Sequence, residues 1–359
     1  MKHLIRGWLM GGGALALIVC ACSPSDQPDA TSHDVADLLV GNSGSSGVEG
    51  YVLSTGDSLG DFIPPGSGGL IFPDAITTGP DGVVYVSSGC RTTADSVCNK
   101  SLSAILRYDG QTGAFLDTLA SGAEPGSPLY RPYGTAFGPE GLLYVASLMT
   151  NQILRYDTAG ALIDVFASGD GLDSLGLNGP NGLAFDDDGR FLYVTTEGDS
   201  LVCPGAPMEG HCKPVFTGGY PSLVLRYEVA TGEKTVFARP PMADSTAPSL
   251  AGIDFGPDGR LYVSDFSVNV VRVYDPATGV QEQLLPTVDS TMCDSTISNP
   301  YTGDLTFDAS GALLVTVGGQ NDGDPGAVVR YWGEGYANNE CLVGPTTQLD
   351  RPVGIDVHQ

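Results

Sequence analysis

Oxygen-bearing side chains recur at matching points of a repeated segment of this chain. Asp74 and Asn181 hold equivalent positions in two copies, and Asp304 lies one position out of register in a third. Carboxylate and amide oxygens are the ligands that Ca²⁺ and Mg²⁺ take in proteins. The three copies alternate along the chain, so a ring of copies would bring these side chains together. One hypothesis is therefore a Ca²⁺ or Mg²⁺ site built from Asp74, Asn181 and Asp304.

Residues for other common mechanisms are scarce. The chain has four histidines, of which His3 and His33 precede the repeats, His211 lies between two cysteines and His358 is next to last. An acid–base pair of histidines, or a histidine-ligated zinc, is hard to assemble from them. The sequence also contains no H-E-x-x-H or phosphate-loop motif, and its G-x-S-x-G match at residues 56–60 lies between two expected strands, not at the strand-to-helix turn that a nucleophile elbow requires. This pattern favours binding over catalysis.

The repeated segment is most complete between residues 131 and 166. It reads as four short runs rich in Val, Leu and Tyr, bounded by Gly, Pro and Asp, which predicts four strands. One such sheet cannot bury both of its faces, so copies must pack against it. The motif Pro-Asp-Gly-Arg-Leu-Tyr262-Val recurs with Tyr85, Tyr144 and Tyr193 in the same place. The spacing fits one four-stranded blade plus loops, the period of a β-propeller.

Five nearly complete copies can be counted, and the two ends of the chain supply a sixth. The first strands are expected to begin near Asp74, Tyr133, Asn181, Ala251 and Gly303. Residues 351–357 match a first strand, while residues 37–40, 51–54 and 61–63 match the second, third and fourth. We predict an all-β, six-bladed propeller of four-stranded antiparallel blades over residues 36–359, a single domain. The C-terminal strand should join the N-terminal blade and so close the ring.

In such a ring the start of each first strand and the end of each second strand lie on the same rim. The opposite rim carries short turns such as Pro80–Gly82 and Pro257–Gly259. Ligands prefer concave sites where polar groups converge, so we expect the ligand site at the channel mouth on the first rim. The residues predicted there are Asp74, Arg131, Tyr133, Asn181, Glu197, Asp265, Asp304 and Arg351.

The N-terminus is typical of an exported lipoprotein. Residues 1–22 have a basic start and an apolar run, and Val-Cys-Ala-Cys22-Ser resembles the bacterial lipobox, which predicts lipidation of Cys22. Plain secretion is the alternative. Ser23 after the cysteine resembles the pattern that sends lipoproteins to the outer membrane of a cell with two membranes. Residues 23–35 are polar and predict a flexible tether.

The six remaining cysteines predict disulfides, since an even number in an exported chain usually pairs. Proximity in sequence favours Cys90 with Cys98 and Cys203 with Cys212, which leaves Cys293 with Cys341. The first two loops follow second strands and are therefore expected on the mouth rim. Stapled loops would pre-organise a binding surface.

The charge of the chain limits its partners. Lys and Arg number 16 against 42 Asp and Glu, giving a formal net charge of −26. Such a surface repels phosphate backbones, which argues against nucleic acid. The expected partners are an unknown small molecule, a glycan or an envelope protein. Contact with the membrane is expected only through the lipid, and we expect a monomer.

The repeated motif P-x-G-(L/I)-x-F-x-P-D-G-x-L-Y-V resembles NHL-type repeats over residues 36–357. The wider group contains gluconolactonase-like propellers of the senescence-marker type and streptogramin-lyase-like propellers. The first resemblance implies a divalent cation held by carboxylates and an Asn, for which Asn181 is the match. The second implies paired central histidines, which this chain lacks. The resemblance is specific for architecture and weak for activity.

We therefore predict a lipid-anchored, extracytoplasmic propeller that binds a ligand or protein through its channel mouth. The alternative is a Ca²⁺- or Mg²⁺-dependent lactonase or hydrolase of the gluconolactonase-like kind, and a lyase is disfavoured. The sequence alone does not decide between a binding protein and an enzyme.

Overall fold

A computed structural model describes residues 36–89, 99–198, 200–202, 213–215, 220–241, 246–287, 293, 297, 299–319 and 323–358. They belong to one compact unit, Val35–Gln359. The predicted leader and tether with Cys22 lie outside the described residues, as do Cys90, Cys98, Cys203 and Cys212. Within the described ranges, no helix is long and apolar enough to cross a membrane.

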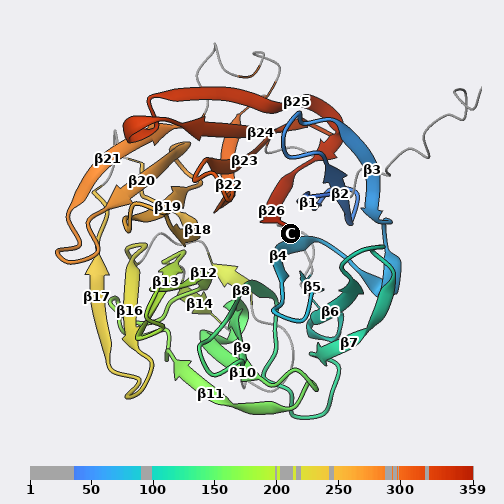
Figure 1. The fold of residues 1–359 in the computed structure, drawn as a ribbon. Coiled ribbons are helices and arrows are strands. Elements are labelled where there is room, and N and C mark those ends of the chain that lie inside the picture. Colours follow the sequence, from blue (N-terminus) through green and yellow to red (C-terminus); the bar gives the residue numbers. More distant parts are fainter. Residues whose placement is uncertain are drawn as a thin grey trace, which may run out of the picture. The chain divides into compact units, whose positions relative to one another are not determined.

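The described residues form six four-stranded antiparallel sheets arranged in a ring (Figure 1), as predicted. The inner strands are β4 (Pro73–Thr78), β8 (Pro132–Phe137), β12 (Pro180–Phe185), β18 (Leu250–Phe255), β22 (Pro300–Phe307) and β26 (Pro352–Val357). The second strands are β5 (Val83–Ser88), β9 (Leu143–Ser147), β13 (Phe191–Thr196), β19 (Leu261–Asp265), β23 (Leu313–Gly319) and β1 (Leu38–Asn42). The third strands are β6 (Ala104–Asp109), β10 (Gln152–Tyr156), β16 (Val224–Glu228), β20 (Val270–Tyr274), β24 (Pro325–Trp332) and β2 (Gly47–Tyr51). The outer strands are β7 (Phe115–Ser121), β11 (Leu162–Ser168), β17 (Lys234–Ala238), β21 (Gln281–Pro286), β25 (Asn338–Asp350) and β3 (Ser58–Ile63).

The ring closes through its last strand. β26 pairs antiparallel with β1, Leu38 opposite Val357, so the C-terminal strand is the inner strand of the N-terminal blade. The third strand of that blade was expected at residues 51–54, but β2 ends at Tyr51. Gly50 explains the shift, because a Cβ there would lie 2.8 Å from the Cβ of Ala36. Glycine permits this close packing while lowering the strand signal in the sequence.

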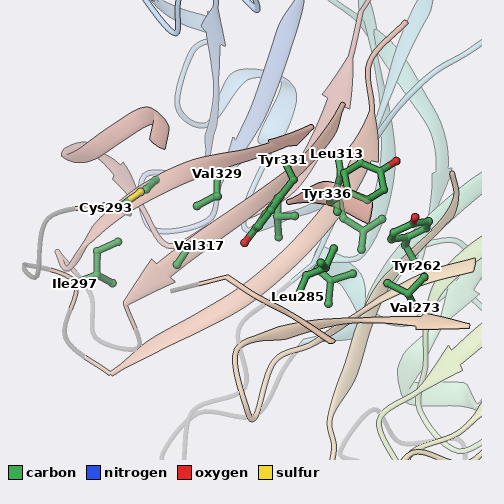
Figure 2. Close-up of a cluster of buried hydrophobic side chains, with 14 residues drawn as sticks. Tyr262, Val273, Leu285, Cys293, Ile297, Leu313, Val317, Val329, Tyr331 and Tyr336 are labelled. Atoms are coloured by element: carbon green, nitrogen blue, oxygen red, sulfur yellow. The ribbon is translucent and has the colours of Figure 1, made fainter. Parts of the chain in front are cut away.

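The repeated tyrosines pack between neighbouring blades. Tyr85, Tyr144, Tyr193 and Tyr262 each meet a phenylalanine of the next inner strand edge-on, with ring centroids 5.0–5.1 Å apart. Counting the blade of β1, β2, β3 and β26 as the first, the fifth blade is β18–β21 and the sixth is β22–β25. Figure 2 shows Tyr262 in the apolar cluster between the fifth and sixth blades. Its hydroxyl donates a 2.8 Å hydrogen bond to Asp258 in the hairpin turn. Edge-to-face packing of this kind fixes how one blade lies on the next.

A bulge in the inner strands turns residues toward the channel. In β4 the register shifts between Pro73 and Ile76, and Ser87 of the second strand accepts a 2.8 Å hydrogen bond from the backbone N–H of Ala75. Bulges at matching points re-aim side chains in β8, β12, β18 and β22. The sequence positions at the bulge are therefore those that line the channel mouth.

The segment before β22 is tied to the outer strand of the same blade. Cys293 and Cys341 form a disulfide, as the sequence predicted. Cys293 is buried against the cluster that contains Tyr331 and Val329. The bond therefore links a connecting segment to the packed interior of the sixth blade.

Candidate ligand site at the channel mouth

Three bulky residues stand directly before inner-strand prolines in a backbone conformation that favours glycine. Phe72 has φ 48°, Arg131 has φ 52° and Arg351 has φ 57°. Left-handed backbone costs an L-residue roughly 1–2 kcal/mol. Such conformations persist where the surrounding fold enforces them, and they concentrate at ligand sites. All three side chains line one cavity at the rim where the inner strands begin.

This mouth cavity has a volume of about 370 Å³, which suits a small organic molecule. Seven of the eight side chains predicted for the channel mouth line it: Asp74, Arg131, Tyr133, Asn181, Glu197, Asp304 and Arg351. They come from β4, β8, β12 and β22 and from the residues beside β8, β13 and β26. The cavity therefore lies at the rim where first strands begin and second strands end, which is where the sequence placed the ligand site.

Asp265, the eighth predicted residue, is not among the residues that line the cavity. It is fully buried inside its blade, where its Oδ2 accepts hydrogen bonds from the Arg272 guanidinium at 2.8 and 2.9 Å. Its Oδ1 accepts from the backbone N–H of Ser249 at 3.1 Å. Arg272 holds the place that leucine takes in other blades, such as Leu106 and Leu154. Ser147 and Thr196, at the equivalent position of other blades, are likewise buried and do not line the cavity, whereas Phe266, one residue later, does.

Asp74 is the most unusual group in the cavity. Its side chain is 4% exposed, and within the described part of the chain neither carboxylate oxygen has a hydrogen-bond partner. Burial raises the pKa of Asp74 to about 8, although the charges of Arg131 and Arg351 act in the opposite direction. Glu197 also raises this pKa. Asp74 is therefore largely protonated at neutral pH and presents both a donor and an acceptor.

The two arginines are held by aromatic rings. Arg131 donates a 2.6 Å hydrogen bond to the hydroxyl of Tyr133, and its guanidinium carbon lies 4.9 Å from the centre of that ring. The guanidinium carbon of Arg351 lies 6.0 Å from the ring centres of both Phe72 and Tyr301. Stacking on a ring orients the plane of a guanidinium.

An aromatic wall was not anticipated from the sequence. Phe266 and Tyr301 stack with ring centroids 4.6 Å apart, and Tyr301 donates a 3.1 Å hydrogen bond to the carbonyl of Pro352. Phe72 also lines the cavity. Phe72 stands before Pro73 as Arg131 stands before Pro132, so aligning the X-Pro pairs would have identified it.

Asn181 and Glu197 form a polar pair on one side of the cavity. The Asn181 amide donates a 3.0 Å hydrogen bond to Glu197 Oε1. The two residues come from the start of β12 and the loop after β13. This is the arrangement expected when a first strand and its second strand meet at the same rim.

Asp304 forms the floor of the mouth cavity. The equivalent inner-strand positions carry Ala or Gly, and a Cβ on Gly252 would lie 2.2 Å from Asp304 Oδ1. Small neighbours therefore leave room for one side chain at the channel axis. Asp304 also lines a second cavity of about 750 Å³ toward the opposite rim, together with Asp254 and Asp356.

Burial shifts the three carboxyls along the channel in the same direction. It raises the pKa of Asp254 and Asp304 to about 7 and that of Asp356 to about 6. Repulsion among the three adds to the shift of Asp304. The interior of the channel thus holds carboxyls that titrate near neutral pH.

The residues at the mouth do not fit a divalent cation. Asp74, Asn181 and Asp304 all line the cavity, but the guanidiniums of Arg131 and Arg351 act on Asp74, where they would repel a cation. Among the described residues, no group of three or more His, Cys, Asp or Glu is arranged to hold a metal ion. The geometry therefore gives the Ca²⁺ or Mg²⁺ hypothesis no support.

Comparisons with known proteins agree on the fold. No family model matches the sequence, and no curated protein matches it. A chain from a nidogen/laminin complex is similar with a TM-score of 0.60 and 14% identity, over 90% of this chain and 98% of that one. A gluconolactonase from Xanthomonas campestris is similar with a TM-score of 0.50 and 18% identity, over 77% of each chain. Identities this low establish the propeller fold alone.

Proposed function

We propose that this chain is a ligand-binding propeller whose site is the mouth cavity. The observation that carries the proposal is Asp74, a buried carboxyl that lines the cavity without a hydrogen-bond partner in the described part of the chain. Leaving a buried polar group unsatisfied costs about 1–3 kcal/mol. A ligand that bonds to Asp74 would remove this cost on binding.

The rest of the cavity supports binding of a small molecule. The left-handed residues Phe72, Arg131 and Arg351 stand directly before the inner strands β4, β8 and β26, which anchor their backbone. Side chains that are already ordered lose little entropy when a ligand arrives. Phe266 and Tyr301 add an apolar surface against which a ligand can pack.

A fragment titration followed by methyl NMR tests the proposal. Small aromatic acids, amides and amines should shift the signals of Ala75 and Val353, which line the cavity. Ala251→Trp places a large side chain in the cavity and should abolish these shifts, whereas Val280→Trp, at a position 59% exposed on an outer turn, should not. Shifts that survive in Ala251→Trp, or that never appear in the unmodified protein, would contradict the proposal.

We further propose that the protein is exported and held in the bacterial cell envelope by a lipid on Cys22, in the outer membrane of a cell with two membranes. The lipobox-like sequence supports this location. The Cys293–Cys341 disulfide fits an oxidising compartment. Metabolic labelling with a fatty acid should mark the protein, and Cys22→Ser should remove both the label and the membrane association. Unlabelled protein in the membrane fraction would contradict lipidation.

A further inference from the structure

We infer that the mouth cavity takes a small organic monoanion, a carboxylate on a flat apolar body. The inference rests on the proposed function and names the ligand class. It follows from which charged groups face the cavity, how their donors are presented and where the aromatic rings lie.

The charge balance at the mouth differs in sign from that of the whole chain. Among the described residues, the titratable and charged groups that line the cavity are Asp74, Arg131, Tyr133, Glu197, Tyr301, Asp304 and Arg351. With Asp74 protonated, the rim holds two guanidiniums against the single carboxylate of Glu197. Asp304 lies below them on the floor and accepts a 2.9 Å hydrogen bond from the Leu305 backbone. The described rim residues thus carry one net positive charge, which partial ionisation of Asp304 below them lowers, on a chain of net charge −26. Such a rim favours a single negative charge over a cation.

The donors at the mouth match a carboxylate. A guanidinium presents a planar fork of N–H groups that a carboxylate accepts in bidentate fashion. Protonated Asp74 offers an O–H to the same group, while a cation would meet Arg131 and Arg351 at close range. Phe72, Phe266 and Tyr301 offer apolar surface to the rest of the ligand. The cavity is therefore suited to a compact molecule with one carboxylate and a ring.

Protonation of Asp74 and binding of the anion should favour each other. A ligand carboxylate near Asp74 stabilises its neutral form, and by linkage the neutral form raises the affinity for the anion. Because the pKa of Asp74 is about 8, affinity should fall as pH rises above about 8. Asp74→Asn keeps a neutral donor at every pH, so it should retain binding and lose this part of the pH dependence. Asp304 titrates near 7, and its contribution should remain in both proteins.

Calorimetric titration with benzoate, benzamide and benzylamine tests the inference, because the three probes share a ring and differ in charge. At pH 7 and low salt, benzoate should bind at least about ten-fold more tightly than benzamide, a difference of about 1.4 kcal/mol. Benzylamine should bind more weakly than either. Arg351→Met should weaken benzoate at least about ten-fold and leave benzamide within about three-fold. If Arg351→Met fails to fold, the pH dependence of benzoate affinity in Asp74→Asn tests the inference instead.

The outcomes separate the inference from the proposed function. Benzamide or benzylamine binding as tightly as benzoate, with all binding blocked by Ala251→Trp, overturns the monoanion and leaves the cavity as a ligand site. An affinity for benzoate that falls above pH 8 in Asp74→Asn as it does in the unmodified protein also overturns the inference. If none of the three probes binds, both proposals fail.

Discussion

Arg272 and Asp265 form a buried ion pair inside the fifth blade, with Nη2 and Oδ2 2.8 Å apart and side chains 2% and 0% exposed. In three other blades the equivalent positions carry a leucine and a serine or threonine, as in Leu154 with Ser147. Ser147 satisfies the backbone N–H of Tyr130, the bond that Asp265 makes to Ser249 in its own blade. The pair thus replaces a leucine and a serine together.

Arg272→Leu should destabilise the protein strongly, because it leaves the Asp265 carboxylate buried without its partner. Removing one member of a buried pair costs about 3–5 kcal/mol. The double change Asp265→Ser with Arg272→Leu recreates the arrangement of the other blades and should recover most of that loss. Urea unfolding measures both. A double variant no more stable than Arg272→Leu would show that the two residues are not coupled.

Stability should fall as pH rises from 5 to 8. Asp254, Asp304 and Asp356 have folded-state pKa values of about 7, 7 and 6 against a usual 3.8. Their stabilising contribution is complete below the unfolded pKa and is lost as pH rises through the folded pKa. Asp254→Asn should raise stability at pH 8 by more than about 1 kcal/mol, roughly one pKa unit, and flatten the profile. A flat profile in the unmodified protein would contradict the shifts.

Deleting residues 351–359 should destabilise the protein or make it aggregate. The deletion removes β26, which leaves β1 as an unpaired edge and opens the ring between β22 and β4. Thermal unfolding and light scattering measure the effect, and deletion of residues 23–33 from the predicted tether is the control. An unchanged melting temperature after loss of β26 would show that the ring does not depend on this closure.

Breaking the Cys293–Cys341 bond should lower stability. The bond closes a sequence separation of 48 residues, and losses of about 2–4 kcal/mol are typical. Changing both cysteines to alanine tests this. Peptide mapping without reduction should recover this pair together with Cys90–Cys98 and Cys203–Cys212, which remain predictions. Crossed pairs or free thiols at these four positions would refute the local assignment.

The sequence predicted the blades because turn residues and strand periodicity are local signals. Four of the second strands follow a Gly-containing turn and carry a Tyr, so the copies could be aligned and the mouth residues read from the alignment. β2 was misplaced because Gly47 and Gly50 weaken the strand signal, although packing requires them: a Cβ on Gly50 would crowd Ala36, and one on Gly47 would crowd the carbonyl of Ile63. Local pattern does not report such a contact between segments.

Asp265 was assigned to the mouth although it holds the repeat position of the buried Ser147 and Thr196, one residue before the position of Glu197. A guanidinium at position 272, where the repeat calls for leucine, was the available signal. The aromatic wall was missed although Phe266 holds the repeat position of Glu197 and Tyr301 that of Phe72 and Arg131, so aligning the blades by their strand pairing would have identified both. The raised pKa of Asp74 could not be predicted from the sequence, because it is caused mainly by burial of the side chain in the folded structure.

A crystal structure of the protein soaked with benzoate tests the central claim most directly. The account predicts electron density for benzoate in the mouth cavity, with its carboxylate against Arg351 and Asp74 and its ring beside Phe266 and Tyr301. Ala251→Trp soaked in the same way should show none there. Benzoate bound only outside the cavity, or density equally strong in Ala251→Trp, would contradict the assignment of the mouth as the ligand site.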